Sequence, residues 1–344
     1  MRLAVDVMGG DHAPDAILKG CIDALSILSP DDEIVLIGDR RDIEETLSER
    51  GIRDPRIQIE PTTQVIGMDE SPVEAVRAKK DSSIVRMAQL GSKRAERRCD
   101  VVLSAGNTGA CVSAATMHMK RLPGAHRPGI AVTIPGFTGP IVLCDAGANP
   151  QPRASHLWQY GLMAEMYART VLGIKKPRVA QMNIGSEEGK GTGLIRQAHD
   201  LLKATPDLNY IGFVEGRDFF DNVADVVVTD GFVGNTLLKM AEGLAKGLFH
   251  ALAHEIFSQA PELALQLEPV LKSFYAKKDY HEFGGAPLLG VNGVCVIAHG
   301  SSEARTITSA IKNCKQFVSA HINEAISARL EATKHLAVPE QEPA

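Results

Sequence analysis

The segment from Asp225 to Thr236, DVVVTDGFVGNT, joins an apolar strand to the start of a helix through polar residues and two glycines. The strand end holds side chains in place, and Gly231 and Gly234 let a backbone approach a ligand closely. The helix start adds unpaired N–H groups and the positive end of the helix dipole, which attract anions. The segment therefore predicts an anion site flanked by Asp230 and Asn235. The side chain of Asn235 would either donate a hydrogen bond to the anion or cap the helix.

Several other strand-to-helix junctions, and one glycine-rich loop, also contain small or polar residues that suit a substrate or phosphate. The candidate binding residues are Asp6, Gly9, Gly10 and Asp11; Ser104, Gly106, Asn107, Thr108 and Gly109; Asp145 and Asn149; Gly284 and Gly285; and His299 and Ser301. Several of them would equally serve as helix caps. His12, at the start of the first expected helix, is either a neighbour of the cap or an acid–base group.

The segment Asn183–Gly193, NIGSEEGKGTG, resembles two nucleotide-binding loops but fits neither. A Walker A loop has four residues between its first glycine and its Gly-Lys pair, whereas Gly185 is followed by only three. No G-x-G-x-x-G follows a strand, so a nicotinamide cofactor lacks its usual fingerprint. We therefore expect no cofactor and no metal. The loop instead presents Lys190, beside Asn183 and Gly185, as a cation for a phosphate or an oxyanion.

The bulk composition describes a globular chain with a full core. It has 344 residues, a hydrophobic content of 44% and a net charge of -5, which disfavours general nucleic-acid binding. None of its 6 cysteines forms a C-x-x-C pair, so buried, reduced thiols are expected. The first residues lack the apolar core of a signal peptide. These features together predict a cytoplasmic protein.

Short β-branched runs alternate with helical patterns, which predicts an α/β fold with a mostly parallel sheet. The expected strands are 3–7, 33–37, 56–60, 101–103, 130–134, 141–143, 178–182, 210–214, 225–228 and 294–298. The expected helices are 14–28, 42–50, 83–98, 107–120, 153–172, 193–204, 234–257 and 303–330. The short turn Pro135–Pro140 predicts a hairpin within this sheet. We expect one large domain over 1–332 and a disordered tail at 333–344.

The segment 237–280 differs from the rest because long apolar side chains recur in it at helical spacing. Pro261 interrupts the pattern, which predicts two helical arms. One interpretation is a helical hairpin packed on the core or on a twin subunit. The other is a partly exposed apolar excursion that contacts a membrane surface or an acyl chain.

The motifs, taken in order, resemble the acyl-ACP:phosphate acyltransferase family of bacterial phospholipid synthesis, where ACP is the acyl carrier protein. The matching stretches are 4–14 (AVDVMGGDHAP), 67–72 (GMDESP) with 78–83 (AKKDSS), 104–109 (SAGNTG), 145–149 (DAGAN), 183–185 (NIG), 229–235 (TDGFVGN), 284–286 (GGA) and 298–301 (AHGS). Singly, most of these motifs are generic strand-to-helix turns. Together they cover roughly residues 1–330 and are specific.

The resemblance implies a homodimer with a three-layer α/β sandwich, similar to the fold of isocitrate and isopropylmalate dehydrogenases and of phosphotransacetylases. It implies that acyl-ACP and inorganic phosphate give acyl phosphate and free ACP. The acyl phosphate then passes to a membrane glycerol-3-phosphate acyltransferase, so peripheral association with the inner face of the cell membrane is expected.

For this reaction, we expect Lys190 and Asn235 to stabilise charge, and His12 or His299 to assist proton transfer. Asp230 and Asp145 would orient these groups. The basic clusters at 79–80, 93–98 and 175–178 are either solvated faces or a docking face for the acidic carrier protein.

Two other classes of function remain open from the sequence. One is a short-chain phosphate acyltransferase or an NAD-dependent dehydrogenase of the same fold. The other is a non-catalytic module that binds a lipid or a carrier protein.

Overall fold

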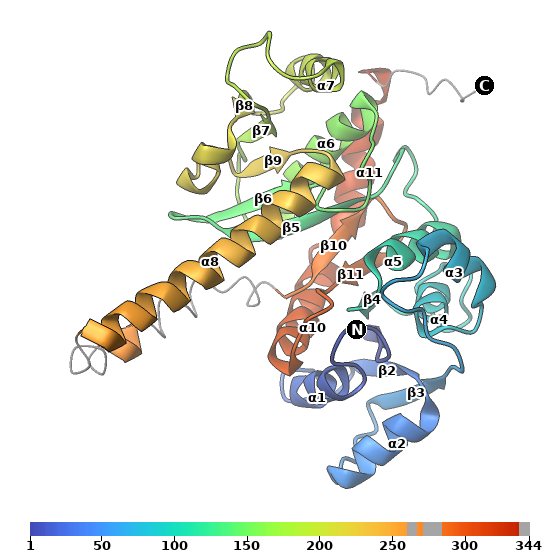
Figure 1. The fold of residues 1–344 in the computed structure, drawn as a ribbon. Helices are drawn as coiled ribbons and strands as arrows, with labels where there is room; N and C mark the ends of the chain where they lie inside the picture. Colours follow the sequence, from blue (N-terminus) through green and yellow to red (C-terminus); the bar gives the residue numbers. More distant parts are fainter. Residues whose placement is uncertain (260–266, 271–283, 337–344) are drawn as a thin grey trace.

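The computed structural model describes residues 1–259, 267–270 and 284–336 (Figure 1). Over these residues one sheet forms the middle layer, in the order β3-β2-β1-β4-β11-β10-β5-β6-β9-β7-β8. The strands are β1 (Arg2–Asp6), β2 (Glu33–Gly38), β3 (Ile57–Pro61), β4 (Val101–Ser104), β5 (Gly129–Pro135), β6 (Pro140–Cys144), β7 (Val179–Met182), β8 (Tyr210–Val214), β9 (Val226–Val228), β10 (Ala286–Leu289) and β11 (Val294–Ile297).

Helices cover both faces of the sheet, which gives the predicted α/β sandwich. Those on one face are α1 (Asp15–Ala24), α2 (Arg40–Glu49), α6 (Ala154–Thr170), α7 (Gly193–Lys203), α10 (Ala304–Ser319) and α11 (Ile322–Ala332). Those on the other are α3 (Pro72–Ala78), α4 (Ser83–Leu90), α5 (Thr108–Ala114) with the π-turn η1 (Ala115–Met119), and the first turns of α8 (Gly231–Gln259). Two 3₁₀ turns, η2 (Gly216–Asp221) and η4 (Lys334–Leu336), are also present. Residues 267–270 are helical, and the rest of the second predicted arm lies outside the described residues.

The strand sequences show why both faces must be covered. Side chains alternate between the two faces of a strand, and in β1 Leu3 and Val5 enter one core while Ala4 enters the other. All three are fully buried. A strand that is apolar on both sides is stable only with helices packed above and below it.

The sheet reverses direction in its middle. Its first strands, β3, β2, β1, β4 and β11, are parallel, as are β6, β9, β7 and β8 at the other end. The three contacts between these groups, β11 to β10, β10 to β5 and β5 to β6, are antiparallel. The two parallel groups therefore run in opposite directions, and their carboxyl ends lie at opposite edges of the sheet.

Most predicted elements are present within one to four residues of their expected ends. The predicted hairpin is confirmed as the antiparallel pair β5 and β6, in which Ala131 pairs with Cys144. The six cysteines are free and buried, also as expected. The tail prediction applies to residues that lie mostly outside the described chain, although Lys334–Leu336 forms a 3₁₀ turn.

Four expectations were wrong or incomplete. The helix predicted at 83–98 ends at Leu90, where Gly91 is the C-cap and the Ser92 hydroxyl accepts from the Arg94 N–H at 3.3 Å. The helix predicted at 303–330 is two helices, because His321 adopts a left-handed conformation with φ 49°. The glycine loop predicted around Gly284 and Gly285 is followed directly by strand β10, which was missed, as was helix α3. Both are short elements next to glycine or proline, where periodicity carries little signal.

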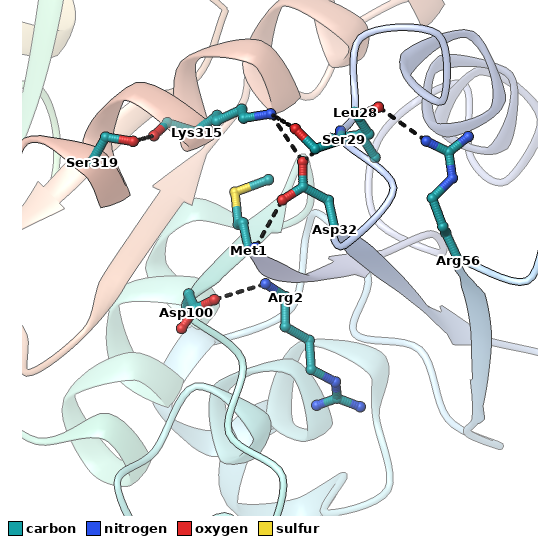
Figure 2. A network of polar contacts seen from close by, with 9 residues as sticks. All are labelled: Met1, Arg2, Leu28, Ser29, Asp32, Arg56, Asp100, Lys315 and Ser319. Atoms are coloured by element: carbon teal, nitrogen blue, oxygen red, sulfur yellow. Dashed lines mark hydrogen bonds and ion pairs between the residues drawn. The ribbon is translucent and has the colours of Figure 1, made fainter.

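The start of β1 is held in place by a network of charged groups (Figure 2). The Met1 ammonium donates to Asp32 at 2.8 Å, and Lys315 of α10 donates to the same carboxylate at 3.0 Å. Burial alone would raise the pKa of Asp32, but the hydrogen bonds from the ammonium, from the Ser29 N–H and from Lys315 lower it to about 2. This network ties β1, the turn before β2 and α10 together.

Helix α8 leaves the body of the molecule after its first turns and projects beyond the sheet (Figure 1). Gly231 and Gly234 are its only buried residues. Met240, Leu244, Leu248 and Leu252 follow at intervals of four residues and are 63%, 58%, 62% and 52% exposed. Even so, in the described part of the chain no helix combines the length and the apolar character that a membrane crossing demands.

Candidate active site

Helix α8 follows β9 in the chain, and its first turn packs against the loop that follows β6. Asp230 caps the helix, because its carboxylate accepts from the Val233 N–H at 2.8 Å. A Cβ at Gly234 would lie 2.0 Å from the carbonyl oxygen of Asp145, and one at Gly231 would lie 2.7 Å from the Asp145 carboxylate. Only glycine fits at these two positions, so the junction brings a helix start and a loop backbone into contact.

Asp145 orders this loop from inside the protein. It is fully buried, and its carboxylate accepts from the N–H groups of Ile130 at 2.9 Å, Ala148 at 3.0 Å and Asn149 at 2.7 Å. Burial raises the pKa of Asp145, and these hydrogen bonds oppose the rise. The side chain of Asn149 donates in turn to the Pro128 carbonyl at 2.7 Å. The geometry gives Asp145 and Asn149 a supporting position beneath the site.

A second buried carboxylate supports the ends of β1 and β4. Asp6 accepts from the Ser104 hydroxyl at 2.7 Å and from the Met8 N–H at 3.1 Å. Burial raises its pKa, and hydrogen bonds lower it again. A Cβ at Gly9 would lie 2.7 Å from the Gly106 nitrogen, so these two turns pack backbone to backbone.

Asn107 holds the loop before α3 over the site. Its carbonyl oxygen caps α5 by accepting from the Ala110 N–H at 3.0 Å. Its amide nitrogen donates to the carbonyls of Gly67 at 3.1 Å, Met68 at 3.2 Å and Glu70 at 3.1 Å. The neighbouring Gly109 packs on Pro72 of α3, since a Cβ there would lie 2.6 Å from that ring. Asn107 is thus both the cap that the sequence allowed and a support for Met68.

A cavity of about 400 Å³ lies between α8 and the sheet. Its floor is apolar and includes Ile130 and Val132 of β5, Ala286 of β10 and Ile297 of β11. The predicted site residues that line it are Asp11, Thr108, Asn235, Gly284, Gly285 and His299. The cavity therefore joins junctions from both halves of the chain.

The reversal of the sheet explains this convergence. Ala286 pairs with Ile297 near the carboxyl end of β11, and Leu288 pairs with Ile130 at the start of β5. These two positions on β10 are two residues apart, which is about 7 Å along a strand. The loop after β11 and the loop after β6 consequently reach the same cavity from opposite edges.

Asn235 lies one turn into α8, on the wall of the cavity. A Cβ built at Gly147 would lie 3.6 Å from the Asn235 side chain, so this residue faces the loop after β6. Its side chain has no hydrogen bond to any described residue. Because Asp230 fills the role of cap, the amide of Asn235 is available to a ligand.

Among the described residues, four charged or titratable side chains line the cavity: Asp11, Lys239, Glu242 and His299. The imidazole Nδ1 of His299 lies 2.8 Å from the Ser301 hydroxyl. Burial raises the pKa of Glu242, and the charges of His299 and Lys239 oppose that rise. Lys239 and Glu242 were missed from the sequence. Their spacing from Asn235, four and seven residues along one helix, was the signal that places all three on one face.

The Lys190 loop lies outside this cavity. Lys190 is 52% exposed and forms an ion pair with Glu187 at 3.7 Å. Asn183 stabilises the loop by donating to the Lys190 carbonyl at 3.4 Å, and Gly185 contacts the Lys190 side chain. The loop follows β7, two strands from β6 in the sheet. A shared site of Lys190 and Asn235 stays a prediction.

The remaining candidates support the rim. Gly10, with φ 116°, lies against the Gly300 carbonyl, which also accepts from the Asp11 N–H at 2.8 Å. A Cβ at Gly284 or Gly285 would meet α10 or β11 at 2.5 Å, so both glycines permit close packing. His12 is exposed and does not line the cavity.

Solved structures define the class of fold. A phosphotransacetylase from Streptococcus pyogenes matches with a TM-score of 0.61 and 17% identity, over 93% of this chain and 94% of that one. A branched-chain phosphotransacylase from Enterococcus faecalis matches with a TM-score of 0.54 and 13% identity, over 92% and 99%. The chain therefore has the fold of the phosphotransacylases, as the sequence motifs predicted.

The chain belongs to the fatty acid synthesis protein family, whose model matches residues 1–325. A phosphate acyltransferase from Dictyoglomus turgidum is 42% identical over 329 residues, which are 95% of this chain and 96% of that protein. One from Desulfitobacterium hafniense is 44% identical over 333 residues, 96% of this chain and 98% of that protein. The family inferred from the motifs is confirmed, and with it the enzyme class, an acyltransferase.

Proposed function

We propose that this protein transfers a fatty acyl group from an acyl carrier protein to inorganic phosphate, giving an acyl phosphate for phospholipid synthesis. One observation carries the proposal. A single cavity combines the side chains of Asn235 and Lys239, which suit an anion, with an apolar floor that suits an acyl chain. The reaction requires these two environments side by side, because phosphate must attack the acyl thioester carbonyl.

The chemistry needs no covalent enzyme intermediate. An oxygen of hydrogen phosphate forms a bond to the carbonyl carbon, the carbon–sulfur bond breaks, and the thiolate takes a proton. Asn235 would donate a hydrogen bond to the phosphate or to the oxyanion, a contribution of roughly 3 kcal/mol to the transition state. His299 would give its proton to the leaving sulfur and recover one from hydrogen phosphate. His299 is favoured over His12 because it lines the cavity.

The other predicted residues would act by supporting these groups. Asp230 caps α8, and Asp145 orders the loop against which α8 starts. Both carboxylates keep the N–H groups of the junction in place, and Asp145 has no exposed surface with which to touch a substrate. Lys190 would contribute its charge only if its loop moves toward the cavity.

One of the three basic clusters has a geometry suited to the acidic carrier protein. Arg94 and Arg97 line a second cavity of about 750 Å³, together with Arg2, Arg86 and Lys120. Each of the three clusters contains a paired cation: Arg97 pairs with Glu33 at 3.1 Å, Lys79 with Glu70 at 2.5 Å and Arg178 with Asp225 at 2.8 Å. Charge complementarity would make the 93–98 cluster the docking face for the carrier.

The exposed apolar face of α8 supports two proposals about surroundings: contact with a second subunit in a homodimer, and peripheral contact with the inner face of the cell membrane. Membrane contact would bring the acyl phosphate close to a membrane glycerol-3-phosphate acyltransferase.

We expect Leu252→Glu with Ile256→Glu to weaken binding to vesicles. His254→Glu with Ser258→Glu adds the same charge at polar positions and is the control. Loss of the dimer or of folding in the first variant alone would instead place this face in a protein interface.

The function is tested by incubating the protein with long-chain acyl carrier protein and phosphate and measuring the free carrier thiol. We expect thiol release that depends on phosphate. Turnover confined to acetyl-CoA would indicate a short-chain phosphate acyltransferase, and binding of the carrier without turnover would indicate a non-catalytic module. A requirement for NAD would indicate a dehydrogenase.

A further inference from the structure

The cavity contains one strong cation among its described lining residues, Lys239. The other titratable groups on its wall are Asp11, Glu242 and His299. A phosphate dianion placed beside two carboxylates is repelled unless a cation balances them. The site therefore needs a positive charge, and the structure offers Lys239 in the right place.

The helix geometry sets Lys239 and Glu242 in line with Asn235. Residues four apart on a helix are neighbours on one face, and seven residues rise by about 10 Å. All three side chains line the same cavity. The Lys239 ammonium has no ion pair within the described residues, whereas Lys190 already faces Glu187 at 3.7 Å. Lys239 can thus bind an incoming anion without breaking an existing pair.

Glu242 lies one turn after Lys239 and is half-buried. It experiences the charges of both Lys239, on its own helix, and His299, on the loop after β11. Glu242 and His299 both line the cavity, so the carboxylate is one of the groups beside which a bound anion needs a balancing cation. The imidazole Nδ1 of His299 lies 2.8 Å from the Ser301 hydroxyl.

We propose that Lys239 is the cation that binds inorganic phosphate in this cavity, where its charge balances the anion beside Asp11 and Glu242. This inference rests on the proposed function and identifies which end of the cavity takes phosphate. Phosphate lies between Lys239 and Asn235, and the thioester sulfur lies toward His299. The proton balance is unchanged: His299 gives one proton to sulfur and regains one from hydrogen phosphate.

The first experiment compares Lys239→Ala, Lys239→Arg and Lys190→Ala with Lys246→Ala, an exposed lysine two turns further along α8. We expect the phosphate KM to rise at least about tenfold in Lys239→Ala, with partial recovery in Lys239→Arg. It should stay within about threefold in Lys190→Ala and not change in Lys246→Ala. An unchanged phosphate KM in folded Lys239→Ala would overturn the proposal, as would a larger effect in Lys190→Ala.

Phosphate binding is also measured without turnover, from the rise in Tm on adding inorganic phosphate. Wild type and Lys246→Ala should gain a few degrees at saturating phosphate, and Lys239→Ala should gain none. This separates the two claims. If wild-type protein releases no carrier thiol but shows phosphate stabilisation that depends on Lys239, the proposed reaction fails and the phosphate site stands. Equal stabilisation of Lys239→Ala overturns the site.

Discussion

Two glycine-rich junctions of this chain differ in what their glycines do. At the start of α8, a Cβ on Gly234 would fall 2.0 Å from the Asp145 carbonyl oxygen. In the loop before α7, a Cβ on Gly189 or Gly193 would meet nothing within 4 Å. The first junction lines the cavity through Asn235, whereas the second extends into solvent with Lys190 half exposed.

The comparison teaches that glycine content alone does not identify a binding site. Glycines required by close backbone approach, as at Gly231 and Gly234, hold a helix start in a fixed place. Glycines in open space give the chain freedom and fix nothing. The junction at α8 is therefore held against the loop after β6, whereas Gly189 and Gly193 leave the Lys190 loop less constrained.

The largest expected difference between the two junctions is in stability. Gly234→Ala should lower the free energy of unfolding by at least about 3 kcal/mol, because a backbone carbonyl cannot move aside easily. Gly189→Ala should change it by no more than about 0.5 kcal/mol. Urea unfolding of both variants measures the difference. Similar values for the two would show that the close approach at Gly234 is absent.

The second largest expected difference between the two junctions is in catalytic activity. Asn235→Ala should lower kcat by about 100-fold, or roughly 2.7 kcal/mol, because it removes a donor aimed into the cavity. The fold should persist, since Asp230 provides the cap of α8. The kinetics are compared with those of Asp230→Ala, which should lose mainly stability. Full turnover in folded Asn235→Ala would remove this residue from the chemistry.

The charged network at Met1 and Asp32 includes neither junction and offers a reference for their effects on stability (Figure 2). Because the folded pKa of Asp32 is about 2, against a usual 3.8, its ion pairs stabilise the fold above pH 4 and are lost as the pH falls toward 2. The full contribution is on the order of 2 kcal/mol. The stability difference between wild type and Asp32→Asn should be about 1 kcal/mol smaller at pH 3 than at pH 5. A difference that does not vary with pH would contradict the ion pairs.

The smallest effect is expected at the open loop. Lys190→Ala should lower turnover by about tenfold and leave stability unchanged, since Lys190 is half exposed and its loop does not line the cavity. Steady-state kinetics and thermal unfolding check the two parts. Wild-type turnover would confine the chemistry to the junction at α8.

The sequence predicted the outer strands well because each is a nearly continuous apolar run bounded by polar turns. It missed β10 because Ala286–Leu289 is short and follows two glycines. That omission hid the reversal of the sheet, and with it the reason why His299 and Asn235 line the same cavity. Long-range pairing of this kind is set by the packing of many strands, which no local pattern records.

Among the candidate residues, spacing identified the helix starts but not the direction of their side chains. Asp145 and Asp6 were both candidate binding residues, and Asp145 was also expected to orient other groups; burial places both beneath the backbone that they support. Lys239 was passed over because it follows an apolar helical run, and Lys190 was preferred because it follows glycines. Only the position of α8 over the sheet shows which lysine lines the cavity.

The most direct test of the central claim compares wild type, Asn235→Ala and Lys190→Ala in one assay of phosphate-dependent thiol release from long-chain acyl carrier protein. If the junction at α8 is the catalytic site, wild type releases thiol, Asn235→Ala loses about 100-fold and Lys190→Ala loses about tenfold. Wild-type activity in Asn235→Ala, with a severe loss in Lys190→Ala, would place the chemistry at the open loop and contradict this account.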